Sequence, residues 1–226
     1  MQKQRGTETL RSVLETTVPH DVGIRSQRQR IVDAMVESCA EKTYAATTIA
    51  DIVSRASISR TTFYKRFEGK RDCFDAALDW CIEELRAAAA GSHTPADPPS
   101  LAVRNAVAAM LELMAAKPGL AQLVIGEAVA VEPAVVKRYR DILIPALERL
   151  WDEAGARRDS GADPKLSFGR AQVLVYNQIL AGDTAELPRL LPDLVYIALL
   201  PFAGHEEALE QARLAGSHSS TGLGDR

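Results

Sequence analysis

Apolar residues recur at the spacing of an α-helix along most of this chain, and no stretch alternates apolar and polar residues as a half-buried strand does. The pattern becomes regular at Gln27 and predicts a first helix that ends near Lys42. Beyond residue 69, further helices are predicted over residues 70–91, 101–116, 120–130, 133–154, 165–180, 187–200 and 206–214. We therefore expect an all-α protein, with a kink at Pro145.

Two short helices are predicted between residues 47 and 67. Thr48 and Asp51 have the spacing of a capping box, in which two residues at a helix N-terminus bond each other's backbone N–H groups. Ser57 interrupts the helical pattern, and Ser59 is a typical N-cap for the helix that follows. Together with the helix that precedes them, the two short helices have the arrangement of a helix-turn-helix.

The last of these three helices has two chemically different faces. Its core face is apolar and holds Ile58, Phe63 and Phe67. Its other face carries Arg60, Thr61, Tyr64 and Lys65. Arginine can donate two hydrogen bonds to guanine, and threonine can contact a thymine methyl group. Tyrosine and lysine suit phosphate oxygens, and the helix N-termini at Thr48 and Ser59 can aim backbone N–H groups at phosphates as well.

Charge is distributed unevenly along the chain. The net charge of −3 is unusual for a protein that binds DNA. Residues 24–71, however, hold ten basic and five acidic side chains, whereas residues 72–226 hold fourteen basic and twenty-two acidic ones. A basic N-terminal part on an acidic remainder favours contact between that part and a polyanion. The alternative is a charged helix face that is only solvated.

The stretch ADIVSRASISRTTFYKRFEGK, residues 50–70, resembles the DNA-binding domain of the TetR family of transcriptional regulators, and its Phe-Tyr-x-x-Phe-x-x-Lys run is the most specific part. The resemblance covers residues 25 to about 75. It implies contacts to the DNA backbone at three positions, Thr48, Tyr64 and Lys70. It implies base and backbone reading at four more, Arg60, Thr61, Thr62 and Lys65.

Two positions depart from the family pattern. Ser57 stands where the family usually has a turn glycine, so the turn is strained if φ is positive there. Thr61 stands where the family often has glycine near the start of the recognition helix. Its side chain adds to the face that enters the DNA groove, so the operator of a relative cannot be assumed.

The expected organisation has four parts. Residues 1–24 form an arm without strong periodicity, and residues 25–71 form the helix-turn-helix domain. Residues 72–215 form a larger helical domain, and residues 216–226 form a tail that lacks apolar content and is predicted to be disordered.

The resemblance implies a ligand cavity among the middle helices and a homodimer formed by two late helices. Candidate cavity residues are Trp80, Met110, Leu111, Met114, Tyr139, Leu143 and Trp151, because aromatic and methionine side chains can surround an apolar ligand. The segment 168–204 is rich in apolar residues and fits the dimer role. The alternative for the candidate cavity residues is that they are ordinary core positions. The alternative for segment 168–204 is that it forms an ordinary pair of core helices.

Other classes of protein find little support in the sequence. The four histidines, His20, His93, His205 and His218, belong to no metal-binding or catalytic motif, and we expect no metal, cofactor or enzymatic activity. The three cysteines lack CxxC spacing and indicate a reducing, cytoplasmic setting. No stretch approaches the roughly 18 apolar residues of a membrane helix, and the N-terminus has no signal-peptide core.

We therefore expect a homodimeric repressor that is released from a palindromic double-stranded DNA operator by a small apolar or amphipathic effector. Two alternatives stay open: a helical small-molecule-binding protein with no DNA role, and a constitutive DNA-binding protein without a ligand response.

Overall fold

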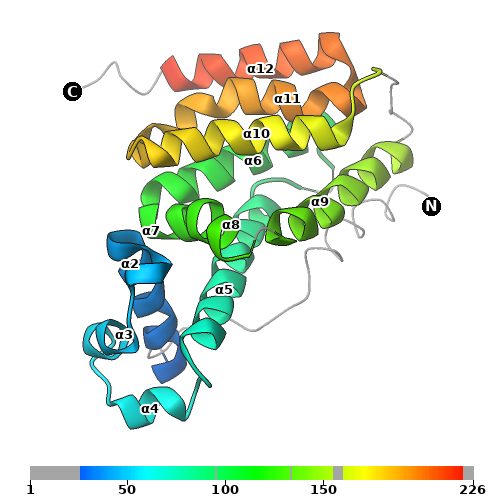
Figure 1. Ribbon diagram of the computed structural model, residues 1–226. Helices are drawn as coiled ribbons and strands as arrows, with labels where there is room; N and C mark the ends of the chain where they lie inside the picture. Colours follow the sequence, from blue (N-terminus) through cyan, green and yellow to red (C-terminus); the bar gives the residue numbers. More distant parts are fainter. Residues whose placement is uncertain (1–25, 95, 133, 155–159, 221–226) are drawn as a thin grey trace.

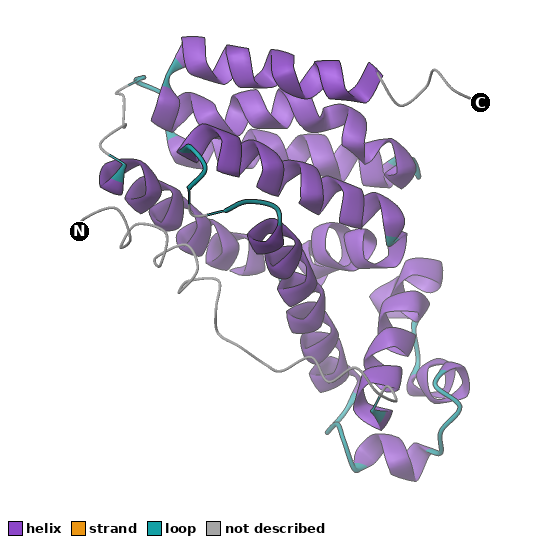
Figure 2. Cartoon of the chain, turned by 180° about the vertical axis from the view of Figure 1, so that it is seen from behind, coloured by secondary structure: helices purple, strands orange, loops and turns teal. Residues whose placement is uncertain are grey.

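The computed structural model describes residues 26–94, 96–132, 134–154 and 160–220. Within these ranges every regular element is a helix, which confirms the expected all-α fold (Figures 1 and 2). The expected N-terminal arm, residues 1–24, and residues 221–226 of the expected tail lie outside the described residues.

Three helices form a small N-terminal domain, the blue to cyan part of Figure 1. They are α2 (Gln27–Ala46), α3 (Ile49–Arg55) and α4 (Arg60–Tyr64). Their shared core holds side chains with no exposed surface, including Ile31, Met35, Ile52 and Phe63. This arrangement confirms the predicted helix-turn-helix. Helix α2 runs past the expected end at Lys42, but Thr43, with φ 71° and ψ 158°, interrupts its last turn.

Helix α5 (Lys70–Gly91) leads from this domain into the larger one, where α6 (Pro99–Ala116) follows. The next three segments are α7 (Pro118–Ala121), a π-helical turn η1 (Gln122–Glu127) and α8 (Ala128–Val131). Together they replace the single helix expected over 120–130, and they bend by 111° from α6. Lys117 leaves the helical region before Pro118, as residues that precede proline commonly do.

The rest of the larger domain consists of α9 (Ala134–Glu153), α10 (Pro164–Leu180), a 3₁₀ segment η2 (Thr184–Leu190), α11 (Leu191–Ala203) and α12 (His205–Ser220). Helix α11 packs against α10, α6 and α12, so it is internal to the protein (Figure 1). The helix expected over 187–200 instead begins with the 3₁₀ segment, which contains Pro188, and becomes α-helical only at Leu191. Proline lacks the N–H that an α-helical interior needs.

Helix α12 corrects the expected end of the ordered chain. The final helix was expected to end at Leu214, yet it continues to Ser220, so residues 216–220 of the expected disordered tail are helical. Ala208, Ala212 and Ala215 are buried on this helix, and Gly216 lies close to Pro192. Packing against α11 therefore supports a segment whose composition alone has little apolar content.

One hydrophobic core extends through both domains. It joins helix-turn-helix residues such as Ile52 and Phe63 to Leu111, Leu123 and Leu194 of the larger domain. A second, smaller core lies among α6, α9, α11 and α12, where the rings of Trp151 and Phe202 stack with centroids 5.4 Å apart. Among the described helices, none is alone long and apolar enough to span a membrane, and only the sharply bent combination of α6 with α7–α8 reaches that apolarity.

Candidate DNA interface and ligand cavity

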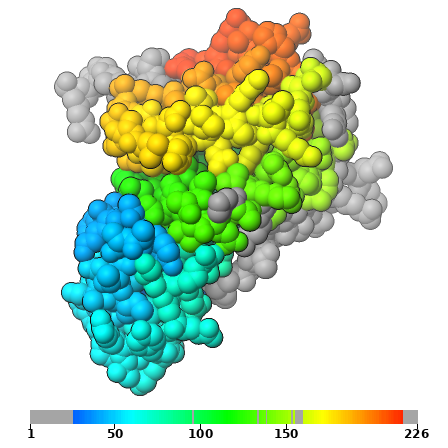
Figure 3. Space-filling model, in the orientation of Figure 1, coloured from blue at the N-terminus to red at the C-terminus, as the bar shows by residue number. Residues whose placement is uncertain are grey.

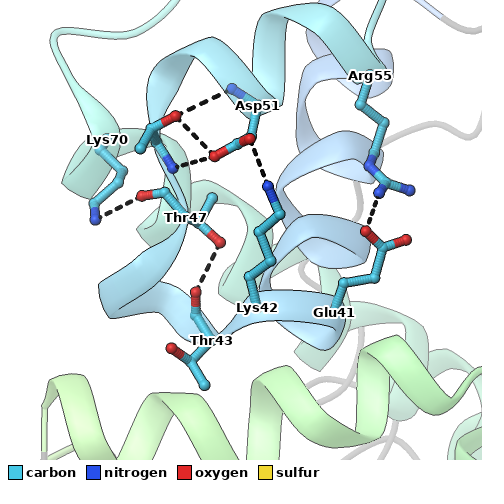
Figure 4. Close-up of polar contacts among 8 residues, drawn as sticks. Glu41, Lys42, Thr43, Thr47, Asp51, Arg55 and Lys70 are labelled. Atoms are coloured by element: carbon cyan, nitrogen blue, oxygen red, sulfur yellow. Dashed lines mark hydrogen bonds and ion pairs between the residues drawn. The ribbon is translucent and has the colours of Figure 1, made fainter.

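Hydrogen bonds at the start of α3 form the predicted capping box (Figure 4). The Thr48 hydroxyl oxygen accepts from the Asp51 N–H at 3.2 Å, and the Asp51 carboxylate accepts from the Thr48 N–H at 2.9 Å. Lys42 also donates to Asp51 at 2.7 Å. The Lys42 bond, followed by the bonds from Thr48, holds the pKa of the Asp51 carboxyl well below its usual range. The carboxylate is therefore charged and fixes α3 to the end of α2.

A second cap starts α4, as predicted for Ser59. The Ser59 hydroxyl oxygen accepts from the Thr62 N–H at 3.1 Å, and the two hydroxyl oxygens lie 2.9 Å apart. Between the two helices, Ser57 has φ 52°, which meets the condition for a strained turn. Phe63 is fully buried on the inner face of α4, 5.7 Å from the ring of Phe67. The turn at Ser57 and the buried ring of Phe63 together hold α4 in place.

The outer face of α4 carries most of the predicted DNA contacts. Arg60, Thr61, Tyr64 and Lys65 are all exposed there, and 56% of the Tyr64 side-chain surface is open to solvent. Helix α4 lies at the end of the lobe that projects from the larger domain in Figures 1 and 3. Thr62 is partly buried because it takes part in the Ser59 cap. The exposed set is therefore accessible to a DNA groove.

Lys70 lies apart from that exposed face. Its ammonium group donates to the carbonyl oxygens of Tyr44 and Thr47, both at 2.9 Å, and lies 4.2 Å from the centre of the Tyr44 ring. These bonds tie the start of α5 to the segment between α2 and α3. This internal role was missed by sequence reasoning, since the partners of Lys70 lie more than twenty residues away along the chain.

An apolar cavity of about 260 Å³ lies in the larger domain. Helices α5, α6, α9, α10 and α11 and the turn η1 contribute to its wall. Five of the predicted cavity residues line it: Met110, Leu111, Met114, Tyr139 and Leu143. Sequence reasoning missed the contribution of α10, which includes Ser167, Phe168 and Gln172. The inward spacing of these residues along one helix is the signal that would have indicated them.

Two predicted cavity residues lie elsewhere. Trp80 is half-buried on α5, and the Lys117 ammonium lies 5.6 Å from the centre of its ring. Trp151 belongs to the second core, where it stacks on Phe202. The expectation that these two residues line the cavity is therefore wrong. Each ring instead packs against a neighbour from a distant part of the sequence, which a sequence pattern does not display.

The segment expected to form a dimer divides into an exposed helix and a buried one. Helix α10 presents a line of apolar side chains to solvent, Leu166, Val173, Tyr176 and Leu180, which we call the α10 stripe. Between 36% and 65% of each of these residues is exposed. Leu194, Val195 and Leu199 of α11 are instead buried within the protein's own core. Any interface in this segment therefore involves α10 far more than α11.

The remaining reactive side chains are internal. Cys39, Cys73 and Cys81 are buried, and burial raises the pKa of the thiol to about 11 at Cys39 and to about 12 at the other two. Neutral thiols are poor nucleophiles and poor metal ligands. Within the ranges that the structure describes, no cluster of three metal-binding side chains occurs.

The fold and the exposed α4 together define a class: helix-turn-helix proteins that carry a larger helical domain with an apolar cavity. Residues 31–77 match the family model described as bacterial regulatory proteins, tetR family. The helix-turn-helix domain of this chain therefore matches the DNA-binding domain of that family over residues 31–77.

Solved structures share this fold. A TetR-like transcriptional regulator from Rhodococcus sp. RHA1 is 18% identical with a TM-score of 0.56, and the match covers 91% of this chain and 100% of that one. The regulator FadR from Bacillus subtilis, in complex with stearoyl-CoA, is 19% identical with a TM-score of 0.58, covering 77% and 97%. A gamma-butyrolactone receptor (ArpA-like protein) is 17% identical with a TM-score of 0.58, covering 85% and 97%. No match to a curated protein sequence was found.

Proposed function

We propose that the protein is a homodimeric repressor that binds a palindromic operator through α4 and is released when a small apolar or amphipathic molecule occupies its cavity. The observation that carries the DNA half is the accessible α4 face, on which Arg60, Thr61 and Lys65 lie together within a basic domain. Sequence is read by Arg60 and Thr61, and position on the duplex is set by Tyr64 and Lys65.

The dimer is proposed to form through the α10 stripe. Two α10 helices that meet across a two-fold axis would bury the same apolar residues from each copy. A two-fold symmetric protein reads a two-fold symmetric DNA site, with its recognition helices about 34 Å apart on one side of the duplex. This geometry is the reason for expecting a palindrome.

The ligand response is proposed from the position of the cavity. Val124 and Ile125 of η1 lie in its wall, and the same turn packs against α2 of the helix-turn-helix domain. A ligand that shifts η1 would therefore shift α2 and change the separation of the two recognition helices. By linkage, operator binding must then weaken ligand binding by the same factor.

Two structural neighbours support the proposed kind of ligand. One is a FadR in complex with stearoyl-CoA, and another is a gamma-butyrolactone receptor. The wall of the cavity in this chain is almost entirely apolar, in keeping with a ligand that has a large apolar part.

The DNA half is tested by selecting bound fragments from random double-stranded DNA at a stated salt concentration. We expect an enriched palindrome, and we expect the double variant Arg60→Ala with Lys65→Ala to lose binding to it. Asp193→Ala serves as a control, because Asp193 is on α11, which lies in the larger domain away from α4 (Figure 1).

Weak, salt-sensitive binding with no enriched sequence would contradict a sequence-specific role and would favour the small-molecule-binding alternative. Enrichment without any effect of ligands on operator affinity would favour the constitutive DNA-binding alternative. Ligand-enhanced operator affinity would contradict the proposed sign of regulation.

A further inference from the structure

Among the residues that the structure describes, none that lines the cavity has a charged side chain. All but three of these lining residues are apolar. The exceptions are Tyr139, Ser167 and Gln172, which are polar but uncharged. A buried ion without a partner costs far more free energy than a buried neutral group, because it loses its hydration and gains nothing in return. Binding of a charged group among these lining residues is therefore unfavourable.

Two of the three polar groups lie on the inner face of α10. Ser167 is 7% exposed, and Gln172 is partly buried one and a half turns further along the helix. Neither side chain hydrogen-bonds to another residue in the part of the chain that the structure describes. Their polar atoms are not among the fully buried ones that lack a partner, so they are accessible to a molecule in the cavity. Both a hydroxyl and a carboxamide can donate and accept, so each can hydrogen-bond to a neutral polar group of a ligand in the cavity.

The size of the cavity sets a second limit. A volume of about 260 Å³ lies just below the range of roughly 300–1,000 Å³ that is usual for ligand pockets. Liquid water fills such a volume with about nine molecules, so a ligand of on the order of ten non-hydrogen atoms would fill it.

We propose that the cavity selects a neutral, compact ligand whose apolar body packs against α6 and α9 and whose single hydroxyl, ester or lactone group hydrogen-bonds to Gln172 and Ser167. Carboxylates of the same size are rejected. This inference rests on the proposed ligand-binding function and names the chemical class of its effector.

A matched set of ten-carbon probes tests the inference on the full-length protein. The probes are 1-decanol, γ-decalactone and decanoate, measured by titration calorimetry near neutral pH, where the carboxylate is ionised. We expect the alcohol and the lactone to bind at least about thirtyfold more tightly than decanoate, because the carboxylate would be buried without a cation. Equal or tighter binding of decanoate would overturn the inference while leaving a ligand-binding function in place.

Variants of α10 test where the polar group of the ligand lies. Gln172→Leu is expected to weaken binding of γ-decalactone about three- to tenfold, since it removes one hydrogen bond and keeps the volume. Asn177→Leu makes the same chemical change at an exposed position of α10 and should leave the affinity unchanged. An unchanged affinity in Gln172→Leu would contradict the assigned site.

Ala171→Phe fills the cavity from the same helix face and should abolish binding of both neutral probes. If no ten-carbon probe binds the unaltered protein, the inference is overturned. The operator selection described above is unaffected by that result, so failure here and failure of the DNA-binding function are distinguishable.

Discussion

Ser57 occupies the turn between α3 and α4 with φ 52°, in the left-handed region that costs a residue with a Cβ about 1–2 kcal/mol. Glycine avoids this cost but adds conformational entropy to the unfolded chain. We expect Ser57→Gly to raise the free energy of unfolding by about 0.5 kcal/mol, measured by urea denaturation.

Ser57→Ala is the matched control, because alanine keeps the Cβ and removes only the hydroxyl. Its stability should stay close to that of the unaltered protein. Equal stabilisation by alanine and glycine would show that the hydroxyl, and not the backbone conformation, is responsible.

The three buried cysteines predict how stability depends on alkaline pH. Their unfolded pKa is close to 9.0, and burial raises the folded pKa to about 11 for Cys39 and about 12 for Cys73 and Cys81. The stability of the neutral thiols is fully present below pH 9 and is lost as the pH rises toward the folded values, because only the unfolded thiols ionise in that window. Each cysteine should contribute a decrease of about 1.4 kcal/mol per pH unit there.

Unfolding experiments between pH 8 and pH 11 can isolate one cysteine at a time. Cys73→Ala removes one thiol and should make the loss of stability with pH measurably shallower than in the unaltered protein. Other groups titrate in the same window, so the difference between the two proteins is the informative quantity. Parallel pH profiles would mean that Cys73 ionises as readily in the folded state as in the unfolded one.

Local patterns at single residues were predictable, and distant partners were not. The caps at Thr48 and Ser59 follow from residues three positions away, which a sequence displays directly. The internal role of Lys70 depends on carbonyls of Tyr44 and Thr47, which only the fold brings close. The same reason explains the misplacement of Trp151, whose partner Phe202 lies in a helix near the C-terminus.

At the scale of elements, the turn η1 connects the cavity to the helix-turn-helix domain. Ile125 lines the cavity, and the Glu127 carboxylate accepts a hydrogen bond at 2.7 Å from the backbone N–H of Tyr44, directly after the distorted Thr43. Gly119 lies just before the turn, where a Cβ would come within 3.3 Å of Val36 on α2. Short π-helical segments of this kind frequently occur at functional sites.

Glu127→Ala should loosen this connection. Loss of a hydrogen bond to a charged acceptor is expected to cost about 1.5 kcal/mol of stability and to speed amide hydrogen exchange in residues 43–48. Operator affinity should fall severalfold, since the start of α3 is less firmly held. Glu127→Gln keeps an acceptor oxygen and should show a smaller effect. Unchanged exchange in Glu127→Ala would contradict a role for this bond in placing α3.

Periodicity predicted the existence of nearly all described helices but not their irregular parts. Residues 101–116 and 165–180 repeat apolar side chains at helical spacing, and the structure places α6 and α10 there. The π-helical turn and the positive φ of Thr43 leave no such signal, and both lie where η1 packs against α2 of the other domain. Pro188, by contrast, does indicate an irregular segment, because proline disfavours the interior of an α-helix, and the 3₁₀ segment contains it.

At the scale of the whole molecule, the helix-turn-helix and the larger domain share one hydrophobic core, and α10 carries two apolar faces. One face lines the cavity and the other is the exposed α10 stripe, and α10 itself lies on the surface in Figure 3. The sequence shows apolar residues on several faces of this segment but does not separate the internal face from the external one. A ligand on one side of α10 and a second copy of the chain on the other would act on the same helix.

This arrangement makes the α10 stripe the place to test the dimer. Val173 is 57% exposed and lies one heptad from both Leu166 and Leu180, so it stands at the centre of the stripe. Val173→Asp would place two carboxylates close together across a two-fold axis, in an interface that excludes water. We expect analytical ultracentrifugation to show a monomer, with operator affinity at least about a hundredfold weaker because the two half-sites are no longer bound together.

Folding should survive this change, because Val173 is exposed in the single chain and contributes little to its core. The matched control is Ile142→Asp, which introduces the same charge at a 54% exposed apolar residue of α9. That variant should remain dimeric and keep its operator affinity. If Val173→Asp stays dimeric and Ile142→Asp becomes monomeric, the interface lies on α9 instead, and the cavity would then be separated from the partner by a different helix.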